Sequence, residues 1–96
     1  MELDRDSKNR EHLREYVREA PLSPGVYLWK DEENRIIYVG KARLLKNRLS
    51  SYFSRTRDVK TAALMRHSRS IETIMVSNEY EALLLENTLI KQHSPK

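Results

Sequence analysis

Two tyrosines and one lysine lie close enough in the sequence to support proton transfer. Tyr27 and Tyr38 fall in two short runs of β-branched and aromatic residues, and Lys41 follows the second run. A phenol titrates near ~10, but a neighbouring ammonium group or metal-bound water favours the phenolate, which accepts a proton from water. A cross-strand aromatic pair is the simpler alternative. The sequence leaves open which tyrosine acts as the base, although Tyr38 lies nearer to Lys41.

Arg48 and Glu86 have side chains suited to the chemistry of a phosphate ester. The planar guanidinium of Arg48 matches the charge that develops on phosphate oxygens during displacement. Glu86 shares one side of a predicted helix with apolar residues, where an unpaired carboxylate is costly to bury. One Mg²⁺ or Mn²⁺ ion would remove this cost, with water and substrate phosphate completing its coordination. The alternatives are a rim carboxylate paired with an arginine, and an Arg48 stem that only packs on the neighbouring strands.

The composition excludes several other kinds of chemistry. The chain has no cysteine, and its three histidines, His12, His67 and His93, lie far apart in the sequence, so disulfides and zinc clusters are not expected. The longest apolar run, Leu83 to Leu85, is far shorter than the ~20 residues of a membrane-spanning helix. The first residues also lack the apolar core of a signal peptide. A cytoplasmic protein without membrane contact is therefore expected.

Positive charge is concentrated in the middle of the chain. Residues 41–69 contain nine basic residues and one acidic residue, whereas the rest of the chain contains nine basic and thirteen acidic residues. A stretch of this sign attracts the phosphate backbone of nucleic acids. The predicted DNA contacts are Lys41, Arg43, Lys46, Arg48, Arg55, Arg57 and Lys60. A solvated basic surface is the alternative.

Hydrophobic periodicity and turn residues predict an α+β domain with three strands. Helices are expected over residues 8–19, 41–53 and 59–69 and from an Asn78 cap to His93, with strands over 26–30, 35–40 and 71–76. The first eight residues are expected to be frayed. In the third helix Ala63, Leu64 and His67 should point inward. The predicted inward side of the last helix comprises Ala82, Leu83, Glu86, Leu89, Ile90 and His93.

The first two predicted strands form a hairpin, and its register decides where the tyrosines lie. If residues 31–34 form the turn, the paired residues are Lys30 with Arg35, Leu28 with Ile37, Tyr27 with Tyr38, Val26 with Val39, and Gly25 with Gly40. The two tyrosines then share one face, and the aliphatic pairs form the core face. Lys41 and Arg48, seven residues apart in the next predicted helix, should lie on its same side beside the hairpin.

These residues resemble a known signature. Gly25-Val26-Tyr27 and Tyr38-Val39-Gly40 resemble the two tripeptides of the GIY-YIG nuclease superfamily. The resemblance narrows to the amino-terminal nuclease domain of the UvrC family through Lys41-Ala42-Arg43, Leu45, Arg48, Ser51-Tyr52-Phe53, Ile71-Glu72-Thr73, the run from Asn78 to Glu86, and Leu89-Ile90-Lys91. It assigns residues 21–96 to one nuclease domain and residues 1–20 to an N-terminal extension and helix.

The resemblance implies a small three-stranded antiparallel sheet flanked by helices and a metal-dependent hydrolysis of DNA. The implied catalytic residues are Tyr27, Tyr38, Lys41, Arg48 and Glu86, with Glu86 as the ligand of one Mg²⁺ or Mn²⁺ ion. The implied function is incision on the 3′ side of a lesion in damaged duplex DNA during nucleotide excision repair. A UvrB-type partner would bind regions outside this sequence.

The family also has an active-site asparagine, which would fall two positions beyond Lys96. We therefore expect this monomeric domain to be a piece of a longer protein. Two other functions fit the same residues: a catalytically silent DNA-binding domain that uses the basic stretch, and a docking module whose uneven charge serves a protein partner.

Overall fold

The computed structural model describes residues 2–54 and 59–94. Its elements are α1 (Glu2–Arg18), β1 (Gly25–Lys30), β2 (Ile36–Ala42), α2 (Leu45–Ser51), α3 (Val59–His67), β3 (Ser70–Met75) and α4 (Glu79–His93). The predicted α+β class is therefore confirmed. Helix α1 begins at Glu2, so the expectation of eight frayed residues was wrong. No helix in the described ranges combines the length and the apolar character needed to span a bilayer.

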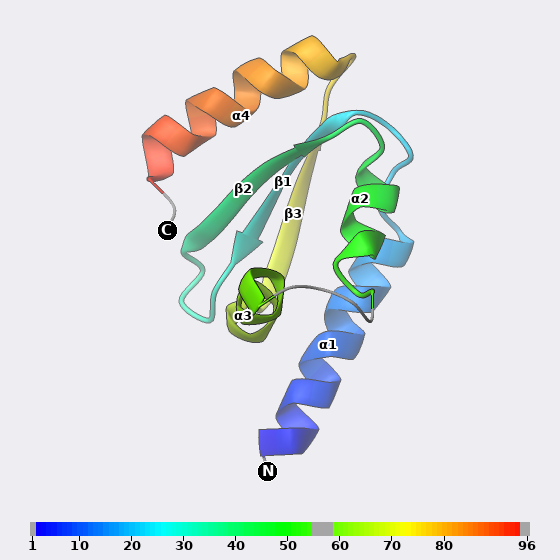
Figure 1. Cartoon of the computed structure of the whole chain (residues 1–96), viewed down its shortest axis with the longest axis vertical. Helices are drawn as coiled ribbons and strands as arrows, with labels where there is room; N and C mark the ends of the chain where they lie inside the picture. The colour runs from blue at the N-terminus through cyan, green and yellow to red at the C-terminus, as the bar shows by residue number, and fades with distance from the viewer. Residues whose placement is uncertain (1, 55–58, 95–96) are drawn as a thin grey trace.

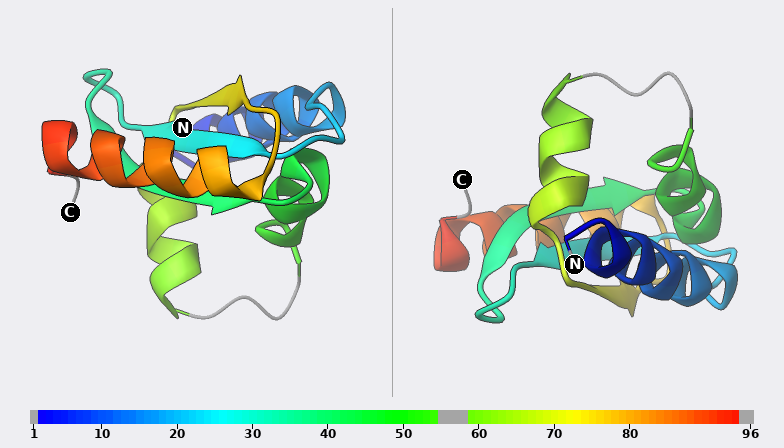
Figure 2. Two further views of the ribbon diagram at one scale, coloured as in Figure 1. Left: turned by 90° about the horizontal axis from the view of Figure 1, so that it is seen from above. Right: turned by 90° about the horizontal axis from the view of Figure 1, so that it is seen from below.

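The three strands form one antiparallel sheet in the order β2-β1-β3, as the predicted three-stranded sheet requires. Helix α4 packs over β2 and β1 on one face, whereas α1 and α2 lie on the other side (Figures 1 and 2). Helix α3 lies at the end of the sheet where β3 begins (Figure 1). The sheet therefore has helices on both faces, and β2 and β3 are its two edges.

Each face of the sheet has its own hydrophobic core. The smaller core, beneath α4, consists of Val26, Leu28, Val39 and Ala82. The larger core contains Tyr27 and Trp29 of β1 together with buried residues of α1, α2 and α3 and the residue that follows α2, namely Leu13, Val17, Leu45, Leu49, Met65 and Tyr52. Packing on both sides buries β1 from Gly25 to Trp29. The face that carries the tyrosines is therefore the more extensively packed one, although the sequence favoured the aliphatic face as the core.

The hairpin turn is one residue longer than predicted. The Asp31 carboxylate accepts hydrogen bonds from the N–H groups of Glu33 and Arg35, both at 2.9 Å. Asn34 adopts the left-handed backbone conformation, with a φ of 64°, which asparagine tolerates better than most residues. The turn therefore includes Arg35, and strand pairing resumes at Ile36.

A β-bulge beside this turn displaces the register by one more residue. Tyr27 faces Gly40 and Tyr38 faces Trp29, so the predicted residue pairs were wrong. Because side chains alternate between faces, a total displacement of two residues leaves most of them on the predicted face. Tyr27 and Tyr38 still share one face, with ring centroids 6.2 Å apart. The exceptions lie at the bulge, where Ile37 packs into the larger core and Ile36 into the smaller one.

Strand β2 continues through Ala42, so α2 begins four residues later than predicted. Pairing of Ala42 with Gly25 extends the strand. The N–H of Leu45 then donates to the carbonyl of Ser23 at 3.0 Å, which fixes the start of α2 against the preceding turn. Lys41 is consequently a strand residue, and its predicted placement on a helix with Arg48 was wrong.

One prediction for helix α3 was wrong, whereas the predicted cap of helix α4 is confirmed. Helix α3 ends at His67, and it buries Met65 while His67 is exposed, so the predicted inward position of His67 was wrong. In α4 the predicted cap is confirmed, because the Asn78 side chain accepts a hydrogen bond from the N–H of Glu81 at 2.9 Å. The Glu81 carboxylate in turn accepts from the N–H of Ser77 at 2.7 Å.

Tyr16 of α1 covers the outer edge of β3. Its hydroxyl accepts a hydrogen bond from the N–H of Thr73 at 3.1 Å and also lies 3.1 Å from the Thr73 hydroxyl. Asn9 donates to the carbonyl of Ser68 at 2.9 Å, just before this strand. These contacts fix α1 beside the core that contains Tyr27.

Candidate active site

The ring of Tyr27 occupies the space over Gly40, the residue that it faces on β2. A Cβ atom at Gly40 would overlap Tyr27 Cζ and would lie 2.5 Å from the Tyr27 hydroxyl oxygen. The φ of Gly40 is not positive, so the strand needs glycine here for this close approach and not for its backbone conformation. Gly40 therefore determines where the Tyr27 hydroxyl lies.

We expect Gly40→Ala to lower the free energy of unfolding by about 1–3 kcal/mol, because the added methyl group overpacks the core. It should also push the Tyr27 ring toward solvent and bring the pKa of Tyr27 back toward its usual value. Urea unfolding followed by Trp29 fluorescence and ultraviolet titration of the tyrosines measure the two effects.

Leu28→Ala is the matched control, because Leu28 lies in the core on the opposite face of the sheet. It should lower the free energy of unfolding by about 2–5 kcal/mol without changing the tyrosine titration. A Gly40→Ala protein with the stability and titration of the wild type would contradict the proposed role of Gly40.

The Tyr27 hydroxyl belongs to a cluster with Tyr52 and Arg48. The two hydroxyl oxygens lie 2.8 Å apart. Arg48 Nε donates to the Tyr27 oxygen at 3.2 Å, and Arg48 Nη2 donates to the Tyr52 oxygen at 3.4 Å. The Arg48 guanidinium carbon also lies 4.8 Å from the centre of the Tyr52 ring, within the range of a cation–π contact. One guanidinium therefore contacts both phenols.

Some O–H and N–H donors of this cluster are not used by hydrogen bonds within it and can bind a ligand. Both phenol oxygens accept from Arg48, and only one of the two O–H groups is needed for the bond between Tyr27 and Tyr52. The other O–H group has no acceptor within the pair, so it can donate to a ligand. Together with unused N–H groups of the guanidinium, it forms a donor set suited to an anion such as phosphate.

Burial raises the pKa of Tyr27, although its hydrogen bonds with Tyr52 and Arg48 lower it in part. Burial also raises the pKa of Tyr52, and the hydrogen bond with Tyr27 adds to that increase. Both phenols are therefore protonated at neutral pH, whereas the sequence suggested that a nearby cation would favour a phenolate. Tyr38 is 37% exposed, whereas Tyr27 and Tyr52 are buried.

Tyr52 is a site residue that the sequence reasoning missed. It appeared there only within Ser51-Tyr52-Phe53, one of the segments that resemble the family, and the structure buries its side chain. The sequence feature that could have identified Tyr52 is its position four residues after Arg48, because residues four apart lie on the same helical face. The structure shows that one side chain serves as both a core residue and a member of the cluster.

Lys41 lies on the opposite face of the sheet from this cluster. It pairs with Val26, whose side chain packs beneath α4, so the Lys41 side chain leaves the strand on the α4 side. Lys41 is exposed and makes no hydrogen bond or ion pair with a described residue. The predicted contact between Lys41 and a tyrosine is therefore not seen among these residues.

Glu86 lies level with the middle of β2. Arg43, directly after β2, lies 3.9 Å from Glu79 at the start of α4. At the other end of α4, His93 shares a hollow with Ile36, the first residue of β2. Helix α4 therefore runs antiparallel alongside β2, and Glu86 is halfway along the helix.

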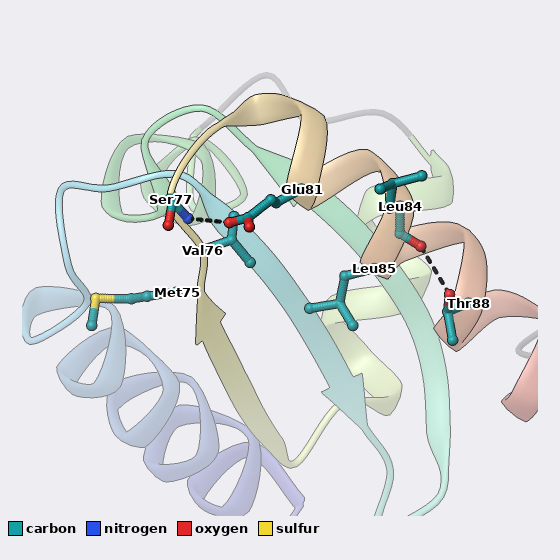
Figure 3. A pocket seen from close by; sticks show the side chains of 7 residues that line it. All are labelled: Met75, Val76, Ser77, Glu81, Leu84, Leu85 and Thr88. Carbon is teal, nitrogen blue, oxygen red and sulfur yellow. Dashed lines mark hydrogen bonds between the residues drawn. The ribbon is translucent and has the colours of Figure 1, made fainter.

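Glu86 also lies on the flank of α4 that faces β2. It is seven residues before His93, and residues seven apart share one side of a helix. The opposite flank, which carries Leu84 and Thr88, borders a groove beside β3 (Figure 3). The hydroxyl of Thr88 in that groove donates to the carbonyl of Leu84 at 3.0 Å, so its polar group is already engaged. No predicted site residue lines the groove.

The environment of Glu86 fits a single hard cation. The inward side of α4 consists of Ala82, Leu85 and Leu89, whereas Leu83, Ile90 and His93 are exposed, so the predicted inward side was partly wrong. Glu86 is half-buried beside this inward side and has no hydrogen bond or ion pair with any described residue. The structured ranges contain no group of three acidic, histidine or cysteine side chains that could hold a metal. A metal at Glu86 would keep most of its water ligands, as Mg²⁺ commonly does.

The five predicted site residues therefore divide between two faces that meet at an edge strand. Tyr27, Tyr38 and Arg48 lie on one side of β2, and Lys41 and Glu86 lie on the other. Because β2 is an edge, an extended ligand lying along it can reach both groups.

The predicted DNA contacts are distributed around the same edge. Lys41 and Arg43 are exposed at the end of β2, Lys46 is half-buried on α2, and Lys60 is exposed on α3. The contact of Arg43 with Glu79 joins two exposed side chains and contributes little to stability. The predicted contacts Arg55 and Arg57 lie outside the described residues.

Comparisons with known proteins agree with this architecture. Residues 23–96 match the family model of the UvrC-like GIY-YIG domain. The chain is 61% identical over 87 residues to UvrABC system protein C of Treponema denticola, covering 91% of this chain and 13% of that protein. It therefore spans only a small part of the length of this relative.

A solved structure shows the same fold. The crystal structure of the GIY-YIG N-terminal endonuclease domain of UvrC from Thermotoga maritima, bound to magnesium as its catalytic divalent cation, matches with a TM-score of 0.83. The two are 42% identical, over 90% of this chain and 94% of that chain. Point mutants of the Thermotoga domain in which a tyrosine is replaced by phenylalanine match with the same TM-score and also contain the divalent cation.

Proposed function

Because the chain belongs to the UvrC-like GIY-YIG family, we propose that it is a nuclease domain that hydrolyses a phosphodiester bond of DNA. The observation that carries this proposal is the cluster of Tyr27, Tyr52 and Arg48, which presents unused donors beside an exposed tyrosine at an edge strand. A purely structural aromatic core does not require a guanidinium bound to two buried phenols.

In the proposed reaction, a water oxygen attacks phosphorus, the bond between phosphorus and the 3′ oxygen breaks, and the departing 3′ oxygen takes up a proton from a solvent water. Tyr38 is the proposed general base that takes the proton of the attacking water, because it is partly exposed whereas Tyr27 and Tyr52 are buried and protonated. Arg48 stabilises the negative charge that develops on the phosphate oxygens. Lys41 binds a neighbouring phosphate from the other side of β2.

Glu86 would hold one divalent cation, Mg²⁺ or Mn²⁺, and magnesium is the catalytic divalent cation of the Thermotoga domain. Its half-buried carboxylate without a protein partner supports this assignment, as does its place level with the middle of β2. When bound, the ion supplies positive charge that stabilises the phosphate and the departing 3′ oxygen.

The proposed substrate is a damaged DNA duplex in nucleotide excision repair, cut on the 3′ side of the lesion. The relatives belong to the UvrABC system, which supports a role in that process and a UvrB-type partner. The basic residues around β2 would bind the DNA backbone through phosphate contacts. Since this chain spans a small part of those relatives, we expect it to bind DNA weakly by itself.

Nicking of a duplex that contains a lesion tests this function. We expect nicks with Mg²⁺ or Mn²⁺ and none with a chelator, while salt-sensitive DNA binding persists in both conditions because binding depends mainly on the basic residues. End-labelled strands locate the cut relative to the lesion. Binding without nicking would indicate a silent DNA-binding domain, and no binding even at low salt would favour a protein-docking module.

A further inference from the structure

Ser51, the last residue of α2, contacts Arg48 in two ways. Its hydroxyl donates to the Arg48 carbonyl at 2.6 Å, and its oxygen accepts from Arg48 Nη1 at 3.3 Å. A serine hydroxyl has one proton, and here that proton is used by the carbonyl. The oxygen can therefore offer only lone pairs to the guanidinium, which fixes the direction of the second bond.

The end of α2 makes this arrangement possible. The N–H groups of Tyr52 and Phe53 donate to the carbonyls of Leu49 and Ser50, both at 3.1 Å, so the last turn tightens to three-residue spacing. The Arg48 carbonyl in this turn accepts the Ser51 hydroxyl. Ser51 is thereby held against the helix and does not rotate freely in solvent.

Ser51 completes the set of partners that hold the Arg48 guanidinium. Nε is bound by Tyr27, Nη2 by Tyr52 and Nη1 by Ser51. Of the five N–H groups of a guanidinium, these bonds use three and leave two. The remaining two belong to Nη1 and Nη2, and they are the groups that a phosphate would meet.

We propose that Ser51 is a positioning residue that orients Arg48 toward the scissile phosphate. The inference rests on the proposed nuclease function, but it adds a residue that acts through Arg48 without touching the substrate. The phenols hold only the Nε and Nη2 side of the guanidinium. Ser51 adds a third contact at Nη1, which prevents the planar guanidinium from tilting about the edge that the phenols hold, so that both remaining donors keep one direction.

The nicking experiment compares Ser51→Ala, Ser51→Thr and Ser50→Ala. Ser50 is the control because it is the neighbouring exposed serine and its side chain makes no hydrogen bond with a described residue. We expect Ser51→Ala to lower kcat about three- to tenfold with KM unchanged, because a misaligned donor affects the transition state more than binding. Ser51→Thr, which keeps the hydroxyl, and Ser50→Ala should stay near wild type.

The same substitution in an Arg48→Ala background tests whether Ser51 acts through Arg48. There Ser51→Ala should have no further effect, because the group that it orients is gone. An equal loss in both backgrounds would overturn the proposal.

An activity-independent measurement keeps this inference separate from the nuclease proposal. In NMR spectra of the whole chain, rotation of the Arg48 guanidinium should be slow in the wild type and in Ser51→Thr, and faster in Ser51→Ala. Unchanged rotation in Ser51→Ala overturns the positioning role. If the wild type fails to nick DNA, the NMR comparison still decides whether Ser51 orients Arg48.

Discussion

Replacing Glu86 with alanine should reduce nicking by at least about 10²-fold while affinity for duplex DNA stays near that of the wild type. The reason is that only the chemical step of the proposed reaction would use the carboxylate, since Glu86 makes no ion pair with a basic residue in the described ranges. The free energy of unfolding should not fall, because Glu86 makes no hydrogen bond or ion pair with a described residue. Single-turnover nicking with Mg²⁺, fluorescence anisotropy of labelled DNA and urea unfolding measure the three quantities.

Glu79→Ala is the matched control, because it removes another carboxylate from α4 at a distance from the middle of β2. It should change nicking by less than about twofold, as expected for an exposed charge outside the site. Paramagnetic Mn²⁺ should broaden the NMR signals of Tyr38 in the wild type but not in Glu86→Ala. A Glu86→Ala protein that loses DNA affinity as strongly as it loses nicking would show that the carboxylate is structural.

Tyr38→Phe should also reduce nicking by about 10²-fold or more, because the variant lacks the group that accepts the proton. Tyr38 is partly exposed, and its hydroxyl makes no hydrogen bond with a described residue, so the free energy of unfolding should change little. DNA affinity should be unchanged, since the charge of the protein is the same. Nicking rates measured together with urea unfolding separate loss of chemistry from loss of structure.

Tyr27→Phe is the informative comparison with Tyr38→Phe, because it also removes a phenol hydroxyl group, but from a buried side chain. It should lower the free energy of unfolding by about 1–3 kcal/mol, since Tyr52 and Arg48 lose a buried partner. If Tyr27→Phe abolished nicking at full stability while Tyr38→Phe nicked normally, Tyr27 would be the base and the assignment to Tyr38 would be wrong.

The sequence predicted correctly that Tyr27 and Tyr38 share one face of the sheet, and this prediction did not depend on the exact register of the hairpin. Side chains alternate along a strand, so any even error in register leaves Tyr27 and Tyr38 on one face. The predicted turn was one residue short and the bulge was not foreseen, but the two errors added to an even number. The cap at Asn78 was predictable because its contacts are local in sequence.

Other parts of the site depend on contacts that the sequence does not display. Lys41 continues a strand because Gly25 and Ala42 pair across the hairpin, and helical periodicity alone could not show this. The Gly40 contact with the Tyr27 ring follows from the actual register and could not be read from the predicted one. Tyr52 was not identified as a candidate site residue from the sequence, because its contact with Arg48 is seen only in the structure.

The hydrogen bond between Tyr16 and the N–H of Thr73 has a consequence for the behaviour of the protein at high concentration. An unpaired edge strand offers its backbone to strands of other molecules and thereby promotes aggregation. Here a phenol of α1 accepts the hydrogen bond of the Thr73 N–H in the middle of that edge, so this donor is not available to an incoming strand. The helix that precedes the family-matched residues therefore also protects the domain from self-association through β3.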